Sequence, residues 1–469
     1  MLLVLVAALV LGWMTSRARR QARAVAALRE AGAVVQFDYE FMNGGEIADG
    51  KPTAPAWLRK SFGEDSFRTV TRLSLTLSEG VTIDSVMGHI EDLDALEELI
   101  FQEEPSEAVM ARLGRMKNLK SLVFAITDET DRSDAFMNQL GKMVNLKNLY
   151  LPVSITDNKL GFIRHLRKLE SLGLMHLAIT DPELQGLESL TNLRRLEMTS
   201  FVPFDASDLE HLTRLPALEE LSLEYDCFDD AGMKPLGAIR SLRKLELRGH
   251  EITDGGLRHL ERLTGLRELS IIGNDVGNEG LTYLLRMTEL RVLNLGGTRV
   301  GDDSVASLGR LTKLEVLDLW NTSVSDSGLE HLKGLTSLRE LDLSATRIGD
   351  AGLSHLKGMS NLRDISLSYT AVGDAGLEHL KRISHLQKVD LISTKTTDAG
   401  LLHLEGMAKL REIRLAYTVI DDAGLEHLKQ GMPALREVDL SDSRVTADGV
   451  ARLMGALPSL RVVWDVKGR

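Results

Sequence analysis

Histidine, which can bind a metal or exchange protons near neutral pH, recurs regularly in this sequence. Seven of the twelve histidines share one repeat position: His211, His259, His331, His355, His379, His403 and His427. A metal site needs ligands that converge on one point, whereas one residue type at a fixed step forms a line. We therefore interpret the histidine column as the exposed flank of repeated helices, with a response to pH as the alternative.

Aspartate, which can bind calcium or cap a helix, forms a second column. Its members are Asp254, Asp302, Asp326, Asp350, Asp374, Asp398 and Asp422. The G-G-x-G-x-D pattern of calcium-binding solenoids is missing, so we expect these carboxylates to accept amide hydrogens in the first turn of each helix. The acidic loop Thr127–Asp134 lacks the central glycine and terminal glutamate of an EF-hand. The sequence therefore predicts no metal site.

No catalytic motif is present in the sequence. There is no G-x-S-x-G, H-E-x-x-H, kinase or phosphate-binding-loop pattern. The single cysteine, Cys227, has no base at a fixed spacing, and it excludes an intrachain disulfide or a multi-cysteine zinc site. The formal net charge of −12 argues against nucleic acid as the main partner. We predict a protein that is not an enzyme and needs no cofactor.

Both columns belong to a repeat of 24 residues, in which Gly328 recurs as Gly352 and Gly376. Apolar and polar residues alternate in Leu338–Leu343, as in a half-buried strand, while the leucines of Gly328–Leu335 have helical spacing. One such unit cannot bury its own leucines, so it must stack on neighbours. Strands are predicted near Leu73, Leu99, Leu122, Leu149, Leu172, Leu196, Leu221, Leu245, Leu269, Leu293, Leu317, Leu341, Ile365, Val389, Ile413, Val438 and Val463.

The pattern L-x-x-L-x-L-x-x-T-x-I from Leu338 to Ile348 resembles the leucine-rich repeat of the ribonuclease-inhibitor type. The resemblance implies a right-handed α/β solenoid, a horseshoe with a parallel sheet on the concave side and short helices on the convex side. The order of apolar segment, arginine-rich helix and FDYE strand before the repeats is similar to that of membrane-anchored bacterial leucine-rich-repeat proteins. The expected divisions are an anchor or signal-like segment (1–16), a juxtamembrane helix and N-terminal cap (17–66) and the solenoid (67–469).

The N-terminal residues 2–13 are strongly apolar and uncharged. The run is shorter than the ~20 residues of a usual spanning helix, and Arg17, Arg19 and Arg20 follow it instead of preceding it as in a secretory signal. We predict a single-pass membrane anchor, with an uncleaved signal peptide as the alternative. The positive-inside rule favours a cytoplasmic repeat domain.

The concave face of the C-terminal half is predicted to be acidic. From Leu269 to Val438 the outward strand positions carry nine acidic residues against two basic ones, Lys388 and Arg414. Large aromatic side chains also point outward there, which a core does not explain. The predicted partner-binding residues are Asp318, Trp320, Glu340, Asp342, Asp364, Tyr369, Asp390, Glu412 and Tyr417.

We therefore expect a monomeric, membrane-anchored scaffold that binds a basic protein on this face. One alternative is a substrate receptor like the F-box-associated leucine-rich-repeat proteins, which the G-L-x-x-L units also resemble; residues 17–66 are short for the adaptor-binding domain this requires. The other alternative is an enzyme with a site in the cap or the acidic loop.

Overall fold

The structure is a computed structural model that describes residues 1–38, 41–42, 45–46, 69–126, 133–151, 155–156, 159–178, 183–200, 204, 206–224, 229–249 and 251–465. The expected helix Trp57–Phe67, the aspartates of the acidic loop before Asp134, and Cys227 lie outside these residues. The chain groups into two compact units, residues 1–202 with 214–218, and residues 203–213 with 219–469.

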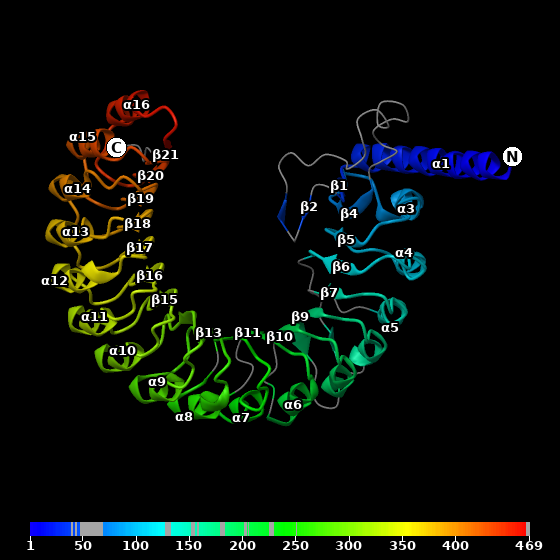
Figure 1. Ribbon diagram of the computed structural model, residues 1–469, viewed down its shortest axis with the longest axis horizontal. Helices are drawn as coiled ribbons and strands as arrows, with labels where there is room; N and C mark the ends of the chain where they lie inside the picture. Colours follow the sequence, from blue (N-terminus) through cyan, green and yellow to red (C-terminus); the bar gives the residue numbers. More distant parts are fainter. Residues whose placement is uncertain are drawn as a thin grey trace. The chain divides into compact units, whose positions relative to one another are not determined.

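The first unit contains the earliest repeats (blue to green in Figure 1). Strands β4 to β7 and β9 to β10 pair in parallel, and β1 pairs antiparallel with β4 at the start of the sheet. The strands are β1 (Val34–Phe37), β2 (Phe41–Met42), β3 (Gly45–Glu46), β4 (Val70–Leu75), β5 (Glu98–Phe101), β6 (Ser121–Phe124), β7 (Asn148–Leu151), β8 (Ile155–Thr156), β9 (Ser171–Ala178) and β10 (Arg195–Ser200). The helices are α1 (Leu2–Glu30), α3 (Ile83–Glu91), α4 (Glu107–Leu113), α5 (Asp134–Leu140), η2 (Leu160–His165) and η3 (Glu183–Ser189).

The N-terminal segment differs from the membrane anchor that the sequence predicted. No helix in the described part of the chain is long and apolar enough to cross a membrane, so the predicted single-pass membrane anchor is wrong. The apolar run and the arginines that follow it form one helix, α1, whose uncharged part is shorter than the ~20 residues of a span. Its second half instead packs beside α3, where Ala24 and Leu28 are fully buried.

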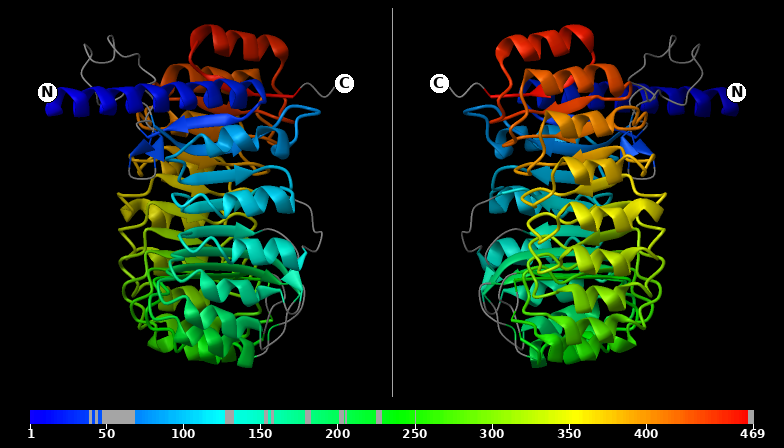
Figure 2. Two further views of the ribbon diagram at one scale, coloured as in Figure 1. Left: turned by 90° about the vertical axis from the view of Figure 1, so that its right-hand side faces the viewer. Right: turned by 90° about the vertical axis from the view of Figure 1, so that its left-hand side faces the viewer.

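The second unit contains the most regular repeats, with strands on the inner side of its arc and helices on the outer side (Figures 1 and 2). Strands β11 to β21 pair in parallel, each with the next. They are β11 (Glu220–Glu224), β12 (Lys244–Arg248), β13 (Glu268–Ser270), β14 (Val292–Asn294), β15 (Val316–Asp318), β16 (Glu340–Asp342), β17 (Asp364–Ser366), β18 (Lys388–Asp390), β19 (Glu412–Arg414), β20 (Glu437–Asp439) and β21 (Arg461–Val463).

The outer helical segments follow in the same order. They are α6 (Ala206–Glu210), η4 (His211–Arg214), α7 (Met233–Leu236), α8 (Asp254–Leu257), η5 (Arg258–Arg262), α9 (Asn278–Leu284), α10 (Asp302–Leu308), α11 (Asp326–Leu332), α12 (Asp350–Leu353), η6 (Ser354–Gly358), α13 (Asp374–Leu380), α14 (Asp398–Leu404), α15 (Asp422–Gly431) and α16 (Ala447–Ala456). The predicted α/β solenoid is confirmed, and each predicted strand is found.

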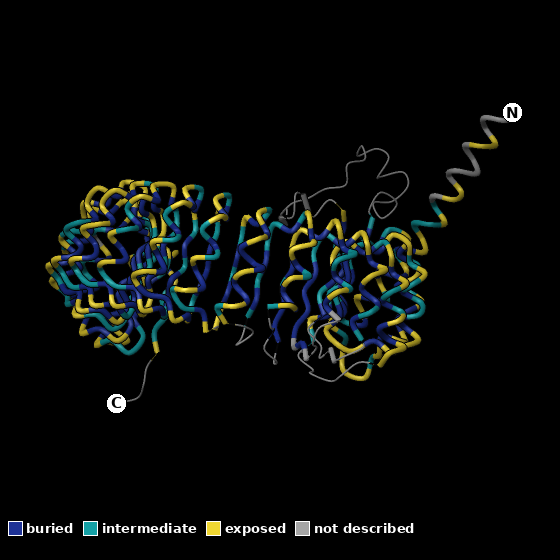
Figure 3. The backbone as a smooth tube through the Cα atoms, turned by 90° about the horizontal axis from the view of Figure 1, so that it is seen from below, coloured by how far each residue is buried: buried dark blue, intermediate teal, exposed yellow. Residues whose placement is uncertain are grey.

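The core is a set of leucines that each repeat contributes at the same positions. Leu329 and Leu332 from the helix and Leu341 and Leu343 from the strand are almost fully buried, and buried positions recur in repeat after repeat in Figure 3. The hydroxyl of each threonine in a column at the strand ends donates to the carbonyl three residues earlier; for Thr322 the acceptor is Leu319 (2.7 Å). This bond satisfies a buried carbonyl where the ladder ends. The same bond is made by Thr298, Thr346, Thr370, Thr394 and Thr418.

The aspartate column connects successive repeats. Each carboxylate lies in the first turn of its helix, as expected, but it accepts the backbone N–H at the start of the next repeat's helix; Asp326 Oδ1 is 2.7 Å from Gly349 N. The carboxylate therefore lies against the next repeat's glycine. A Cβ on Gly352 would be 2.5 Å from Asp326 Oδ1, so glycine is needed opposite the aspartate for this close approach and not for a special φ.

Candidate functional site

The sheet of the second unit brings the predicted acidic residues onto two adjacent columns of its concave face. Because the parallel strands pair without a shift, Asp318 is directly opposite Asp342, and Glu340 is opposite Asp364. The same register places Lys388 beside Asp364 and Arg414 beside Asp390. The register therefore concentrates negative charge at β15 to β17. Like charges that face each other on neighbouring strands are unfavourable.

The acids on either side of these strands are neutralised by ion pairs. Lys388 Nζ lies 3.0 Å from Glu412 Oε1, and Arg414 NH1 lies 3.5 Å from Asp390 Oδ2. Near the start of the unit, Lys244 Nζ is 3.0 Å from Glu246 and 3.5 Å from Glu268. These pairs leave little net charge on β12, β13, β18 and β19. Of the predicted site, Asp390 and Glu412 are therefore already compensated.

Four carboxylates on β15 to β17 have no such partner. Within the described residues, no cation lies at ion-pair distance from them, and all four line one hollow of about 380 Å³ on the concave face. Asp390, Lys388 and Arg414 line the other end of this hollow. We call these four carboxylates the acidic cluster: Asp318, Glu340, Asp342 and Asp364.

Burial and repulsion act together on two members of the acidic cluster. Burial raises the pKa of Asp318; the backbone N–H of Trp320, 2.8 Å from Asp318 Oδ1, opposes this and the carboxylate of Asp342 adds to it. Burial also raises the pKa of Asp364, where Lys388 opposes the effect and Glu412 adds to it. Both carboxylates are thus less favourable in their charged form than in water, and a bound cation would relieve this.

Trp320 lies at the edge of the acidic cluster and is 44% exposed. Its ring lies over the glycines of the preceding repeat: a Cβ on Gly296 would be 3.3 Å from Trp320 Cε3, and one on Gly297 would be 3.8 Å from Cζ3. The indole therefore rests on bare backbone and presents its other side to solvent. Such a supported and exposed ring is the usual form of a binding anchor.

Tyr369 and Tyr417 occupy a backbone position that disfavours large side chains. Their φ angles are 58° and 57°, in the left-handed region, which costs a residue with a Cβ about 1–2 kcal/mol. Earlier repeats have glycine there, at Gly249, Gly273 and Gly297. The two rings are nevertheless 61% and 55% exposed, so burial does not compensate for the strained backbone. Strain of this kind at an exposed residue is a reason to suspect function.

The aromatic residues do not form one stack. Trp320 leans toward β14, whereas Tyr369 follows β17, and no ring contact joins the three residues in the described structure.

The other candidate residues lie on the helix side. The histidines of the column are on the outer helices, and the described residues include no group of three side chains able to hold a metal. One of these histidines, His427, has its Nδ1 2.8 Å from Glu405 Oε1.

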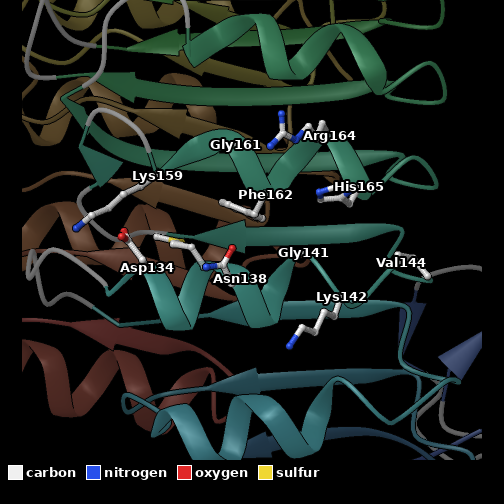
Figure 4. A pocket seen from close by; sticks show the side chains of 11 residues that line it. Asp134, Asn138, Gly141, Lys142, Val144, Lys159, Gly161, Phe162, Arg164 and His165 are labelled. Atoms are coloured by element: carbon white, nitrogen blue, oxygen red, sulfur yellow. The ribbon is translucent and has the colours of Figure 1, made fainter.

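In the first unit, a hollow of about 730 Å³ lies between α5 and η2 (Figure 4). It has buried Met137 and Phe162 on its floor, with Lys142, Arg164 and His165 around it, and Lys142 Nζ already donates to Gln139 (3.1 Å).

The repeats match a known family over most of their length. The sequence profile described as "leucine-rich repeat region" matches residues 66–253 and 234–466. This chain belongs to the leucine-rich-repeat family. No curated protein sequence matches it.

Two solved structures are similar to this leucine-rich-repeat protein in fold. A leucine-rich-repeat protein of Leptospira interrogans is 18% identical, with a TM-score of 0.54 over 80% of this chain and 91% of its own. An internalin of Listeria monocytogenes is 23% identical, with a TM-score of 0.49 over 71% of this chain and 92% of its own. At this identity the Leptospira structure shows the fold alone. Leucine-rich-repeat solenoids generally serve as protein-binding scaffolds with an extended concave surface.

The sequence pointed to the concave face but could not separate paired from unpaired acids, because many pairing partners, such as Lys388 for Glu412, lie one repeat away. The sequence analysis also did not reveal the repeat position with a left-handed backbone, which Tyr369 and Tyr417 occupy. Its signal in the leucine-rich repeats is the glycine at 249, 273 and 297, which gives way to asparagine, alanine, tyrosine or serine later in the chain.

Proposed function

We propose that this leucine-rich-repeat protein is a non-catalytic scaffold that binds a basic protein on the concave face of its second unit. The acidic cluster supports this proposal most directly, because four carboxylates without ion pairs line one hollow while the acids around them are paired. A lysine or arginine of the partner would neutralise them, and Trp320 would anchor the contact.

The partner's charge follows from the physical state of the acidic cluster. The raised pKa values of Asp318 and Asp364 mean that a nearby cation stabilises their charged form. Carboxylates on an open face mainly speed the encounter and select the partner, so binding should weaken as salt increases. We take the protein to act as a monomer, with Tyr369 and Tyr417 as secondary contacts on the same side of the sheet.

Affinity capture with the full chain as bait, compared between wild type and Asp342→Lys, tests the proposal. The relevant partner is a basic protein that the wild type retains and the variant loses. In surface plasmon resonance with that partner, Trp320→Ala should weaken binding by about 2 kcal/mol. Asp342→Lys should slow association more than it speeds dissociation.

A partner that binds Trp320→Ala with wild-type affinity and no dependence on salt would place the binding site elsewhere. Circular dichroism of both variants provides the control for folding. Trp320 lies outside the leucine core, so its removal should leave the spectrum unchanged.

A further inference from the structure

A basic hollow lies on the helix side of the second unit, away from the strands of the acidic cluster. It occupies about 580 Å³ between α7 and η5. Four cationic side chains and one carboxylate surround it, together with one imidazole: Lys234, Arg240, Arg258, Arg262, Glu261 and His259. The chain as a whole has a net charge of −12, so this local excess of positive charge runs against its composition.

The four cations have no carboxylate partner among the residues that the structure describes, whereas other helix-side lysines do. Lys333 Nζ lies 3.4 Å from Glu330, and Lys429 Nζ lies 3.2 Å from Glu426. Those glutamates occupy the repeat position that Lys234 and Arg258 occupy here. In these two repeats that position carries a cation, while the position of Lys333 carries Gly237 in one repeat and Glu261 in the other.

Comparison of the repeats with one another shows that this substitution is local. The position of Lys234 and Arg258 is uncharged or acidic in each of the next seven repeats: Thr282, Ala306, Glu330, Ser354, Glu378, Leu402 and Glu426. The position of Arg240 is a small residue in the same stretch: Thr264, Thr288, Thr312, Thr336, Ser360, Ser384 and Ala408. Ordinary helix surface in this solenoid does not require these cations.

The backbone brings the two repeats close together at this point. A Cβ on Gly237, at the end of α7, would lie 2.0 Å from the carbonyl oxygen of His259, so only glycine allows this approach. His259 is half-buried, and the side chain of Arg258 donates to its Nε2 (3.4 Å). Burial lowers the pKa of His259, and Arg258 and Lys234 lower it further, while Asp230 opposes them.

We propose that this hollow, lined by Lys234, Arg240, Arg258 and Arg262, binds a ligand that carries two or more phosphate groups. Arginine matches the oxygens of a phosphate with paired donors. The four cations lie on two successive repeats around a hollow of about 580 Å³, which has room for a ligand with several phosphate groups. The site is separate from the proposed protein-binding surface and does not depend on it.

Isothermal titration of the full chain with tripolyphosphate at constant ionic strength tests the proposal, with inorganic phosphate as the weaker probe. Arg240→Thr and Arg258→Ser introduce residues that neighbouring repeats carry, so folding should be retained. Together they should weaken tripolyphosphate binding by roughly tenfold or more. The matched control is Arg310→Gln, an exposed arginine at the repeat position of Arg262, which should leave binding unchanged.

His259 provides an independent spectroscopic readout. A bound polyanion offsets the repulsion from Arg258 and Lys234, so the titration midpoint of His259 in NMR spectra should move to higher pH. The acidic residues near His259 are present in both the free and the bound protein, so they do not cause this change. They are Glu261 on the same helical turn, Asp230 before α7 and Glu279 of α9. Arg240→Thr should reduce the shift.

Three results would overturn the assignment. They are the absence of saturable tripolyphosphate binding, a double variant that binds as tightly as wild type, and a His259 midpoint that stays fixed at saturation. Tighter binding of a short DNA oligonucleotide than of tripolyphosphate would also overturn it, because the hollow would then contact a nucleic-acid backbone.

Discussion

Replacing Gly352 with alanine should destabilise the protein, although the same change inside a helix is normally favourable. An ordinary helical glycine gains about 1 kcal/mol on this substitution. Here the new Cβ would lie 2.5 Å from Asp326 Oδ1 and 3.0 Å from Asp326 Cα, and the carboxylate is held by its bond to the backbone of Gly349 (2.7 Å). Neither atom can move away without loss of packing or of that bond.

The loss of stability in Gly352→Ala can be estimated from the interactions that the new Cβ would disrupt. Loss of a hydrogen bond to a charged group costs about 1.5–3 kcal/mol, and forcing extra volume into a packed contact costs about 1–3 kcal/mol. After subtraction of the helix-propensity gain, we expect a net loss of about 1.5–5 kcal/mol. Gly358→Ala in the same repeat is the control, because a Cβ there has no atom within 4 Å; it should be neutral or slightly stabilising.

Guanidinium denaturation followed by circular dichroism measures the global effect. Long repeat arrays can lose two-state behaviour, so hydrogen exchange in α12 supplies the local value. The pair Asp326→Asn with Gly352→Ser copies an arrangement that the chain already contains, in which Ser304 donates to Asn278. This double variant should be more stable than Gly352→Ala. If Gly352→Ala is as stable as Gly358→Ala, the contact between the aspartate and the next repeat's glycine is wrong.

Two further predictions concern the concave face. Tyr369→Gly should raise stability by about 1 kcal/mol, because glycine adopts φ near 58° without strain. Asn321→Gly should raise stability less, because asparagine tolerates this backbone region. Equal changes in the urea midpoints of the two variants would contradict the strain argument. Asp364→Asn should be more stable than wild type at pH 7, because burial raises the pKa of this acid and its charged form destabilises the fold. That advantage should shrink as the pH falls through the raised pKa and vanish below about pH 3, where the carboxyl group is protonated in both the folded and unfolded states; an advantage that persists at low pH would have another cause.

The repeat period accounts for what the sequence predicted well. Each strand from Leu73 to Val463 could be placed because burial of leucine at a fixed step leaves one register. The period could not show which neighbour a side chain contacts. The aspartates were expected to act within their own helix, and they bind the next repeat because the stacked units bring Asp326 to Gly349.

The N-terminal segment and the acidic cluster show a second limit. Composition alone suggested a membrane span at residues 2–13, whereas the helix continues to Glu30 and its second half packs on the first repeats. The nine outward acids were all equivalent in the sequence. Only the spatial pairing of acids such as Glu412 with Lys388 and Asp390 with Arg414 separated the compensated acids from the others, four of which form the acidic cluster.

The central claim is that the unpaired acids of β15 to β17, and not the overall acidity of the concave face, bind the partner. Two variants with the same change in charge test this claim against the captured partner in surface plasmon resonance. The first neutralises the acidic cluster by Asp318→Asn, Glu340→Gln, Asp342→Asn and Asp364→Asn. The second neutralises ion-paired acids on the same face by Glu246→Gln, Glu268→Gln, Glu412→Gln and Glu437→Gln.

The account predicts that binding at physiological salt is lost in the first variant and retained within about threefold in the second, because the second variant keeps the four carboxylates of the acidic cluster that would contact the partner. Equal loss in both variants, or full binding by the first, would contradict it.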